Sequence, residues 1–73
     1  MSHEEELKYL EDLAIRLKSL RKEKGFAQYD CGVDERTIRR IESPKENFNP
    51  SYLTLVEISN HFGMTISELL NFK

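Results

Sequence analysis

The chain has 73 residues, of which 38% are hydrophobic and 33% charged, and its formal net charge is −2. This length fits one small domain, and the apolar content is too high for a disordered tail. No stretch of about 18 apolar residues is present, which excludes a membrane-spanning helix. The acidic N-terminus has no hydrophobic signal core, so we expect a cytoplasmic protein.

The chain contains one cysteine, Cys31, and two histidines, His3 and His61. A single thiol cannot form an internal disulfide, and these three side chains are too scattered for a structural zinc site. We therefore expect no metal and no cofactor. We interpret Cys31 as a buried structural thiol. The sequence contains neither a nucleophile–base pair nor a phosphate-binding glycine loop, so we do not expect an enzyme.

Charge is unevenly distributed along the chain. Residues 1–15 carry five acids and one base, residues 16–45 carry nine bases and five acids, and residues 46–73 carry three acids and one base. A basic band of net +4 therefore lies between acidic ends of net −4 and −2. Such a band favours a polyanionic partner, and the alternative is a set of ordinary solvated helix faces.

The first predicted helix runs from Ser2 to about Lys24. Ser2 and Glu5 form a capping-box pattern, and Gly25 is a typical residue to follow a helix end. One apolar stripe with spacings of three and four predicts the buried face: Leu7, Leu10, Leu13, Ala14, Leu17 and Leu20. Residues 26–33 are ambiguous, and at most one helical turn fits before Gly32.

A second clear helix is predicted from Glu35 to about Ser43, with Asp34 as its N-cap. Pro44 disfavours helix at the residue before it, and residues 44–49 form a polar loop. Asn49 and Pro50 then read as an N-cap and a first helical residue.

The helix that follows has Tyr52, Leu55 and Phe62 on its core face and ends at Gly63. Thr65 and Glu68 form a second capping box, which opens a short helix that carries Leu69 and Leu70. We find no strand, so the prediction is an all-α, compact bundle of four to five helices.

The helix at 35–43 carries an unusual charge pattern. On a helical wheel, Ile38 and Ile41 define the buried side. The opposite side holds Arg36, Arg39, Arg40 and Ser43, flanked by Glu35, Thr37 and Glu42. Arginine suits the reading of guanine in the major groove, because its planar fork reaches two acceptors together. The alternative is a solvated cationic face, balanced by an ion pair between Glu35 and Arg39.

Three stretches resemble the phage repressor and Cro-type, or XRE-type, helix-turn-helix domains. They are residues 16–28 (RLKSLRKEKGFAQ), residues 32–42 (GVDERTIRRIE), and residues 49–55 with 63–70 (NPSYLTL and GMTISELL). The resemblance covers about residues 13–72. It implies a single lambda-repressor-like helix-turn-helix domain over residues 1–73, with residues 1–12 as a helical N-terminal extension.

The resemblance also implies roles for individual residues. Helix 35–43 would enter the DNA major groove, and the DNA-binding residues would be Gln28, Glu35, Arg36, Thr37, Arg39, Arg40 and Asn49. Gln28 would open the motif's first helix, where it touches a phosphate or braces the recognition helix. Glu42 matches a glutamate that forms a structural salt bridge with the arginine at the end of the preceding long helix, here Arg21.

Two departures from the family pattern matter. Gln28 and Gly32 are four positions apart, which leaves the motif's first helix about one turn short. Either this helix is shortened, or a turn of residues is missing from the sequence. The core side chains lost in a shortened helix favour the second reading. The segment from Glu42 to Pro50 is longer than in the family, which leaves open whether Asn47 or Asn49 faces the DNA backbone.

Our hypothesis is a bacterial or phage-type, sequence-specific double-stranded DNA-binding transcriptional regulator with no small-molecule substrate. The alternative is a protein–protein interaction module, antitoxin-like or regulatory, on the same fold. Such domains commonly bind two-fold symmetric sites, which makes a homodimer through Leu7 and Tyr9 one interpretation of the N-terminal extension. Burial of that extension against its own domain is the interpretation that its short leucine pattern favours.

Overall fold

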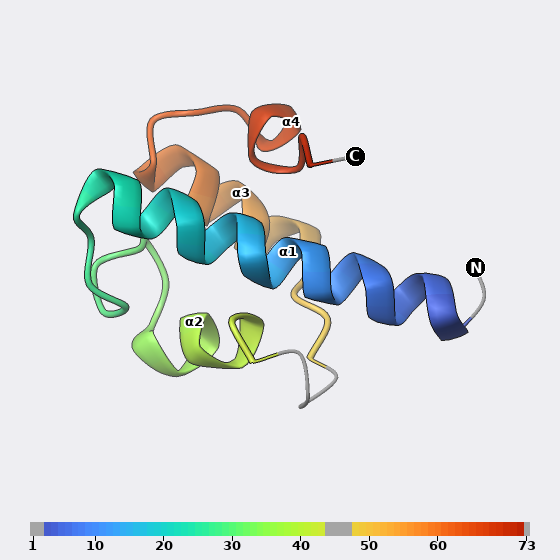
Figure 1. The fold of residues 1–73 in the computed structure, drawn as a ribbon. Helices are drawn as coiled ribbons and strands as arrows, with labels where there is room; N and C mark the ends of the chain where they lie inside the picture. The colour runs from blue at the N-terminus through green and yellow to red at the C-terminus, as the bar shows by residue number, and fades with distance from the viewer. Residues whose placement is uncertain (1–2, 44–47, 73) are drawn as a thin grey trace.

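The computed structural model describes residues 3–43 and 48–72 and contains four α-helices within them (Figure 1). These are α1 (His3–Lys24), α2 (Glu35–Ile41), α3 (Tyr52–His61) and α4 (Ile66–Leu69). No residue of the described ranges lies in a strand, so the all-α prediction is confirmed. In Figure 1, α2 lies below the long helix α1 and α4 above it, while α3 runs partly behind α1; α1 contacts α2, and α3 contacts α4. The Cα radius of gyration is 11.4 Å, which matches the value of about 11 Å expected for a compact chain of this length.

Helix α1 forms where the leucine pattern predicts it and buries that stripe except for Leu7, which is half-buried. Leu13 and Leu17 are each 1% exposed, and Leu10, Ala14 and Leu20 are also buried. Acidic residues fill its first turn and basic residues its last, which suits the helix dipole. The helix ends at Lys24, followed by Gly25 at a φ of 72°, as predicted. The predicted cap at Ser2 lies outside the described residues.

The N-terminal part of α1 packs partly against the domain. Leu10 is buried, and the Tyr9 ring lies 6.0 Å from the ring of Phe72 near the C-terminus. Burial raises the pKa of the Tyr9 phenol. The structure thus shows the intramolecular packing that the short leucine pattern favours.

Residues 25–34 connect α1 to α2 as turns and bends, without a helix. Cys31 is fully buried, and the Phe26 ring lies 5.5 Å from that of Phe62, so this segment supplies core side chains of its own. Gly32 has a φ of 86°, and a Cβ there would stand 2.8 Å from the backbone oxygen of Glu57. A glycine at this position lets the backbone of the connection pass against α3.

Helix α2 is capped and anchored as its sequence predicts. The Asp34 carboxylate accepts hydrogen bonds from the Thr37 backbone N–H at 3.2 Å and the Thr37 hydroxyl at 2.6 Å. Ile38 and Ile41 are buried at 0% and 3% exposure. The helix ends at Ile41 rather than about Ser43, because Glu42 becomes its C-cap.

The start of α3 differs from the prediction. Its N-cap is Ser51, whose hydroxyl accepts from the Thr54 backbone N–H at 3.2 Å, and not Asn49. Pro50 therefore precedes the cap and is buried, as is Leu55 four residues into the helix. These are the two positions of a hydrophobic staple, which fixes how the chain enters the helix. Tyr52, expected in the core, is 69% exposed because it begins the helix at the edge of its buried face.

Helix α4 is short and is held at both ends. Thr65 and Glu68 form the predicted capping box, and its hydrogen bonds lower the pKa of Glu68. At the other end, the Arg16 guanidinium donates to the backbone oxygens of Glu68 at 2.8 Å and Leu69 at 3.2 Å. An arginine of α1 thus supplies donors to carbonyls at the end of the helix, of which Glu68 O also accepts from the Asn71 backbone N–H at 3.2 Å.

The cap of α2 predicts an acid-dependent loss of stability. Hydrogen bonds from Thr37 hold the pKa of Asp34 below its ordinary value. The resulting stabilisation is fully present above that ordinary value and is lost as the pH falls through the lowered one, in the range below about pH 4. Asp34→Asn keeps a capping side chain but cannot titrate.

The check is the thermal midpoint of unfolding between pH 7 and pH 2, which we expect to fall more steeply for the wild type than for Asp34→Asn. Parallel curves would contradict this role for Asp34.

Candidate nucleic-acid interface

The outer side of α2 carries a concentrated positive charge. Arg36, Arg39 and Arg40 are exposed there, and together with half-buried Ser43 they line an open surface concavity. We call these four residues the arginine face. Ile38 and Ile41 hold the opposite side of the helix in the core. The predicted division of α2 into an apolar and a cationic side is therefore present.

Two of the three arginines contact neighbouring side chains in different ways. Arg39 Nη2 donates to Glu35 Oε2 at 2.8 Å, one helical turn away, in an exposed ion pair. The Arg40 guanidinium carbon lies 4.2 Å from the centre of the Phe48 ring. Arg39 thus contacts a carboxylate on its own helix, and Arg40 contacts an aromatic ring from the segment that follows α2.

Arg36 lies near the N-terminal end of α2, close to the charge of its cap. Hydrogen bonds from Thr37 lower the pKa of the Asp34 carboxyl most, and the positive charge of Arg36 lowers it further. Thr37, predicted to bind DNA, uses both its hydroxyl and its backbone N–H on Asp34. In the structure, Thr37 therefore belongs to the cap that starts the helix.

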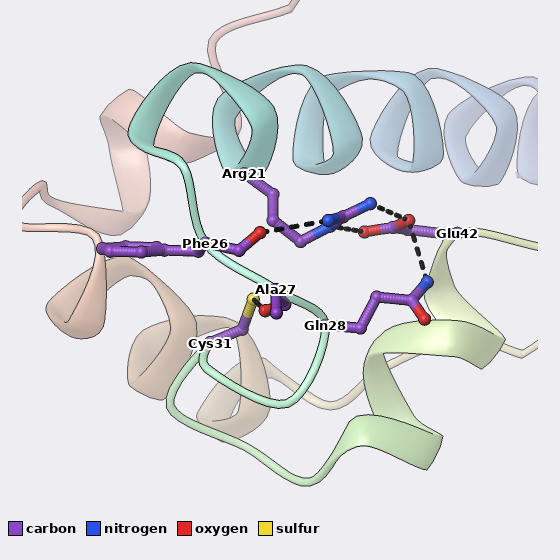
Figure 2. A network of polar contacts seen from close by, with 6 residues as sticks. All are labelled: Arg21, Phe26, Ala27, Gln28, Cys31 and Glu42. Atoms are coloured by element: carbon purple, nitrogen blue, oxygen red, sulfur yellow. Dashed lines mark hydrogen bonds and ion pairs between the residues drawn. The ribbon is translucent and has the colours of Figure 1, made fainter.

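A polar network fixes the C-terminal end of α2 against α1 (Figure 2). Arg21 donates to both carboxylate oxygens of Glu42, from Nε at 2.7 Å and from Nη2 at 3.1 Å. The two side chains are only 13% and 6% exposed. Arg21 Nη1 also donates to the backbone oxygen of Phe26 at 3.1 Å. The hydrogen bond to Glu42 raises the pKa of Arg21. The structure thus contains the Arg21–Glu42 ion pair that the resemblance implies.

Gln28 joins this network from the connecting segment. Its Nε2 donates to Glu42 Oε1 at 3.3 Å, and Figure 2 shows it reaching the carboxylate from the side opposite Arg21. Gln28 stands in a turn, because residues 25–34 form no helix, so the expectation that it opens a helix is wrong. Of its two predicted roles, the structure contains the brace to the end of α2.

Two other predicted DNA contacts, Gln28 and Asn49, come from the segments that precede and follow α2. Asn49 is exposed two residues before the Ser51 cap. Neither Asn49 nor Gln28 is among the described residues that line the concavity. Asn47 lies outside the described residues. Sequence reasoning missed the contact of Phe48 with Arg40, for which the only signal was an aromatic residue in the loop that follows a basic helix.

Two further reactive side chains, buried Cys31 and exposed His61, make contacts within the fold. Cys31 Sγ donates to the Ala27 backbone oxygen at 3.3 Å, and burial raises the pKa of its thiol, which disfavours the nucleophilic thiolate. His61 Nε2 lies 3.0 Å from Asp30 Oδ1, and its ring lies 5.1 Å from that of Phe26. Within residues 3–43 and 48–72, no group of three or more His, Cys, Asp or Glu side chains could hold a metal ion.

Comparison with protein-family models, with curated proteins and with solved structures gives no match for this chain. Among the helices described, none combines the length and the apolar character needed to cross a membrane. The arginine face and the network that positions it therefore carry the functional argument.

Proposed function

We propose that the protein is a sequence-specific double-stranded DNA-binding transcriptional regulator in which α2 enters the major groove. The observation that carries this proposal is the exposed arginine face on a helix whose other side is locked into the core. A helix of seven residues is about 10 Å long. Its diameter with side chains is about 10–12 Å, which fits the major groove, about 12 Å wide.

The proposed motif is a helix-turn-helix of the repressor and Cro type with an altered first half. Residues 25–34 would take the place of its first helix, and α2 would be its recognition helix. The Arg21–Glu42–Gln28 network supports this assignment, because it fixes the angle at which α2 leaves the body of the domain. A reading helix must be held rigidly for base contacts to discriminate between sequences.

The charges around the arginine face suit DNA. Glu42 is committed to Arg21, and Arg36, Arg39 and Arg40 project from one side of a helix of two turns. Like charges at such spacing repel, and phosphate groups would relieve that repulsion. Arginine forks would then read guanine edges, while the surrounding positive charge attracts the duplex in a salt-dependent manner.

Selection of duplexes from a random pool, followed by binding measurements at matched salt, tests this function. We expect the wild type to enrich one short motif. A palindromic motif with half-sites about one DNA turn apart would indicate that two copies bind. Failure to retain any duplex at low salt would contradict the proposal.

A protein-interaction module is the second candidate. Within residues 3–43 and 48–72, the exposed large apolar side chains are Ile15, Tyr29, Tyr52 and Leu53. Exposed apolar residues scattered singly are common, but they also serve as contacts between proteins. A stable complex with a purified protein, together with no duplex retention, would favour this candidate over DNA binding.

The ion pair between Glu35 and Arg39 predicts a variant with stronger non-specific binding. Glu35→Gln removes a negative charge from the proposed DNA side and releases Arg39 for a phosphate. We expect tighter binding to unrelated duplexes and a plot of log affinity against log salt that is steeper by about one unit. Glu57→Gln is the control, since it removes an exposed carboxylate from α3. Identical salt slopes for the wild type and Glu35→Gln would contradict this account of Arg39.

A further inference from the structure

Ser43 is the hydroxyl-bearing member of the arginine face. It follows the C-cap Glu42, and its backbone N–H donates to the Arg40 backbone oxygen at 3.3 Å, which adds a turn to the end of α2. Its side chain is half-buried and lines the same open concavity as the three arginines. A side chain that can carry a covalent modification thus lies beside the positive charges of α2.

We propose that Ser43 is a phosphorylation site and that a phosphate there, held by the arginine face, opposes DNA binding. This inference rests on the proposed function. The phosphate donor would be ATP and the catalyst a protein serine kinase. The Ser43 oxygen forms a bond to the γ-phosphorus, and the bond between that phosphorus and the bridging oxygen of ADP breaks. ADP leaves, and the hydroxyl proton passes to the base of the kinase.

A phosphate on Ser43 would lie within reach of complementary charge. Phosphoserine carries about −1.5 to −2 charges at pH 7, and its oxygens form charge-assisted hydrogen bonds with arginine. Three arginines line the concavity, so one phosphate would cancel roughly half to two-thirds of their charge. Side chains one helical turn apart lie within a Debye length of about 8–10 Å. The attraction therefore acts whichever hydrogen bonds the arginines already make.

The end of α2 contributes negative charge that opposes a phosphate, but less than the arginines contribute. The C-terminus of a helix carries a partial charge of about −0.5. The carboxylate of Glu42, the residue before Ser43, is bonded to Arg21 and only 6% exposed. Glu35 lies at the other end of α2 and is paired with Arg39. The balance at Ser43 therefore favours a phosphate.

The surroundings of Ser43 also suit a kinase whose substrate cleft is acidic. Arginines precede it at three, four and seven positions, and kinases select their substrates partly by such charge patterns. Ser59 provides the contrast. It is 1% exposed, and its Oγ donates to the Val56 backbone oxygen at 2.8 Å, so the fold withholds that hydroxyl from an enzyme. Ser43 lines a concavity that is open to solvent.

The first test places phosphoserine at position 43 during translation of the full chain. The control carries phosphoserine at position 67 instead, because Ser67 is exposed on α4, and α4 and α2 lie on opposite sides of α1 in Figure 1. We expect phosphate at position 43 to weaken binding to the selected duplex by roughly tenfold or more, with a salt slope shallower by about two units. Phosphate at position 67 should change affinity much less.

Two measurements need no DNA. In a phosphorus NMR titration, the second pKa of the phosphate at position 43, ordinarily about 6, should be lower than in the same form carrying Arg36→Gln and Arg39→Gln, because nearby cations favour the dianion. The folded, unmodified chain is also incubated with ATP and a purified serine kinase that prefers arginine before its target. Mass spectrometry should then locate a phosphate on Ser43.

Equal affinity of the unmodified chain and the form phosphorylated at position 43 would overturn the proposal, as would equal losses at positions 43 and 67. A phosphate pKa that ignores the arginine substitutions, loss of the fold on phosphorylation, or labelling of Ser43 only after unfolding in urea would also overturn it. None of these results contradicts DNA binding by the unmodified chain. A wild type that selects no duplex would instead contradict the proposed function, and the phosphorus titration would still decide whether the arginine face holds the phosphate.

Discussion

Replacing Arg36 and Arg40 together by Ala is expected to lower affinity for the selected duplex by a factor of about 30 or more. Each arginine that grips a guanine edge is worth about 1–3 kcal/mol of discrimination, and the variant removes two of them. Both side chains are exposed, so their removal leaves no cavity and no unpaired buried group. The measurement is fluorescence anisotropy of a labelled duplex at matched salt, with circular dichroism to verify the fold.

The control for this experiment removes the same amount of positive charge elsewhere. Lys8 and Lys18 are exposed on α1, so the combined change Lys8→Ala and Lys18→Ala matches the loss of two cations. We expect this control to weaken binding only modestly and equally for selected and unrelated duplexes. Wild-type affinity in the Arg36 and Arg40 variant, or an equal loss in the control, would contradict a reading role for α2.

Glu42→Ala is expected to unfold a large part of the protein at room temperature. It leaves the guanidinium of Arg21 without its carboxylate in a site where that side chain is only 13% exposed. Breaking a buried ion pair on one side costs about 3–5 kcal/mol. A domain of this size has a total stability of roughly 3–5 kcal/mol. Urea unfolding followed by circular dichroism measures the loss.

Two comparisons make the Glu42 prediction specific. Glu35→Ala breaks an ion pair of the same chemistry on the surface, and exposed pairs contribute about 0–1 kcal/mol. The double change Arg21→Met and Glu42→Met removes both charges and should recover much of the stability, because no buried charge is left alone. If Glu42→Ala is as mild as Glu35→Ala, the network of Figure 2 does not hold α2 in place.

Signals confined to a few neighbouring residues were sufficient to predict much of the fold. The leucine spacing of α1, the Asp34 cap and the Thr65 capping box each operate within one or two helical turns. The division of α2 into an isoleucine side and an arginine side has the same local origin. Backbone hydrogen bonding and apolar periodicity indicate such features from neighbouring residues alone.

Features that depend on distant residues could not be predicted in this way. Asn49 and Ser51 are equally good N-caps, and the choice of Ser51 goes together with the burial of Pro50. Arg16 caps α4 across 53 positions of sequence, and no local pattern indicates that contact. The contact of Phe48 with Arg40 likewise joins α2 to a residue outside any helix, where the sequence gives no periodicity.

The burial of Cys31 has a consequence for how this protein responds to oxidants. The only thiol of the chain is fully buried and donates a hydrogen bond to the Ala27 backbone oxygen. Both residues lie in the segment that leads to α2. Peroxides and alkylating reagents attack the exposed thiolate, so they reach this sulfur only in molecules whose core has already opened. Oxidation or alkylation of Cys31 would thus accumulate in unfolded molecules. Folded molecules, in which α2 is in place, would not react.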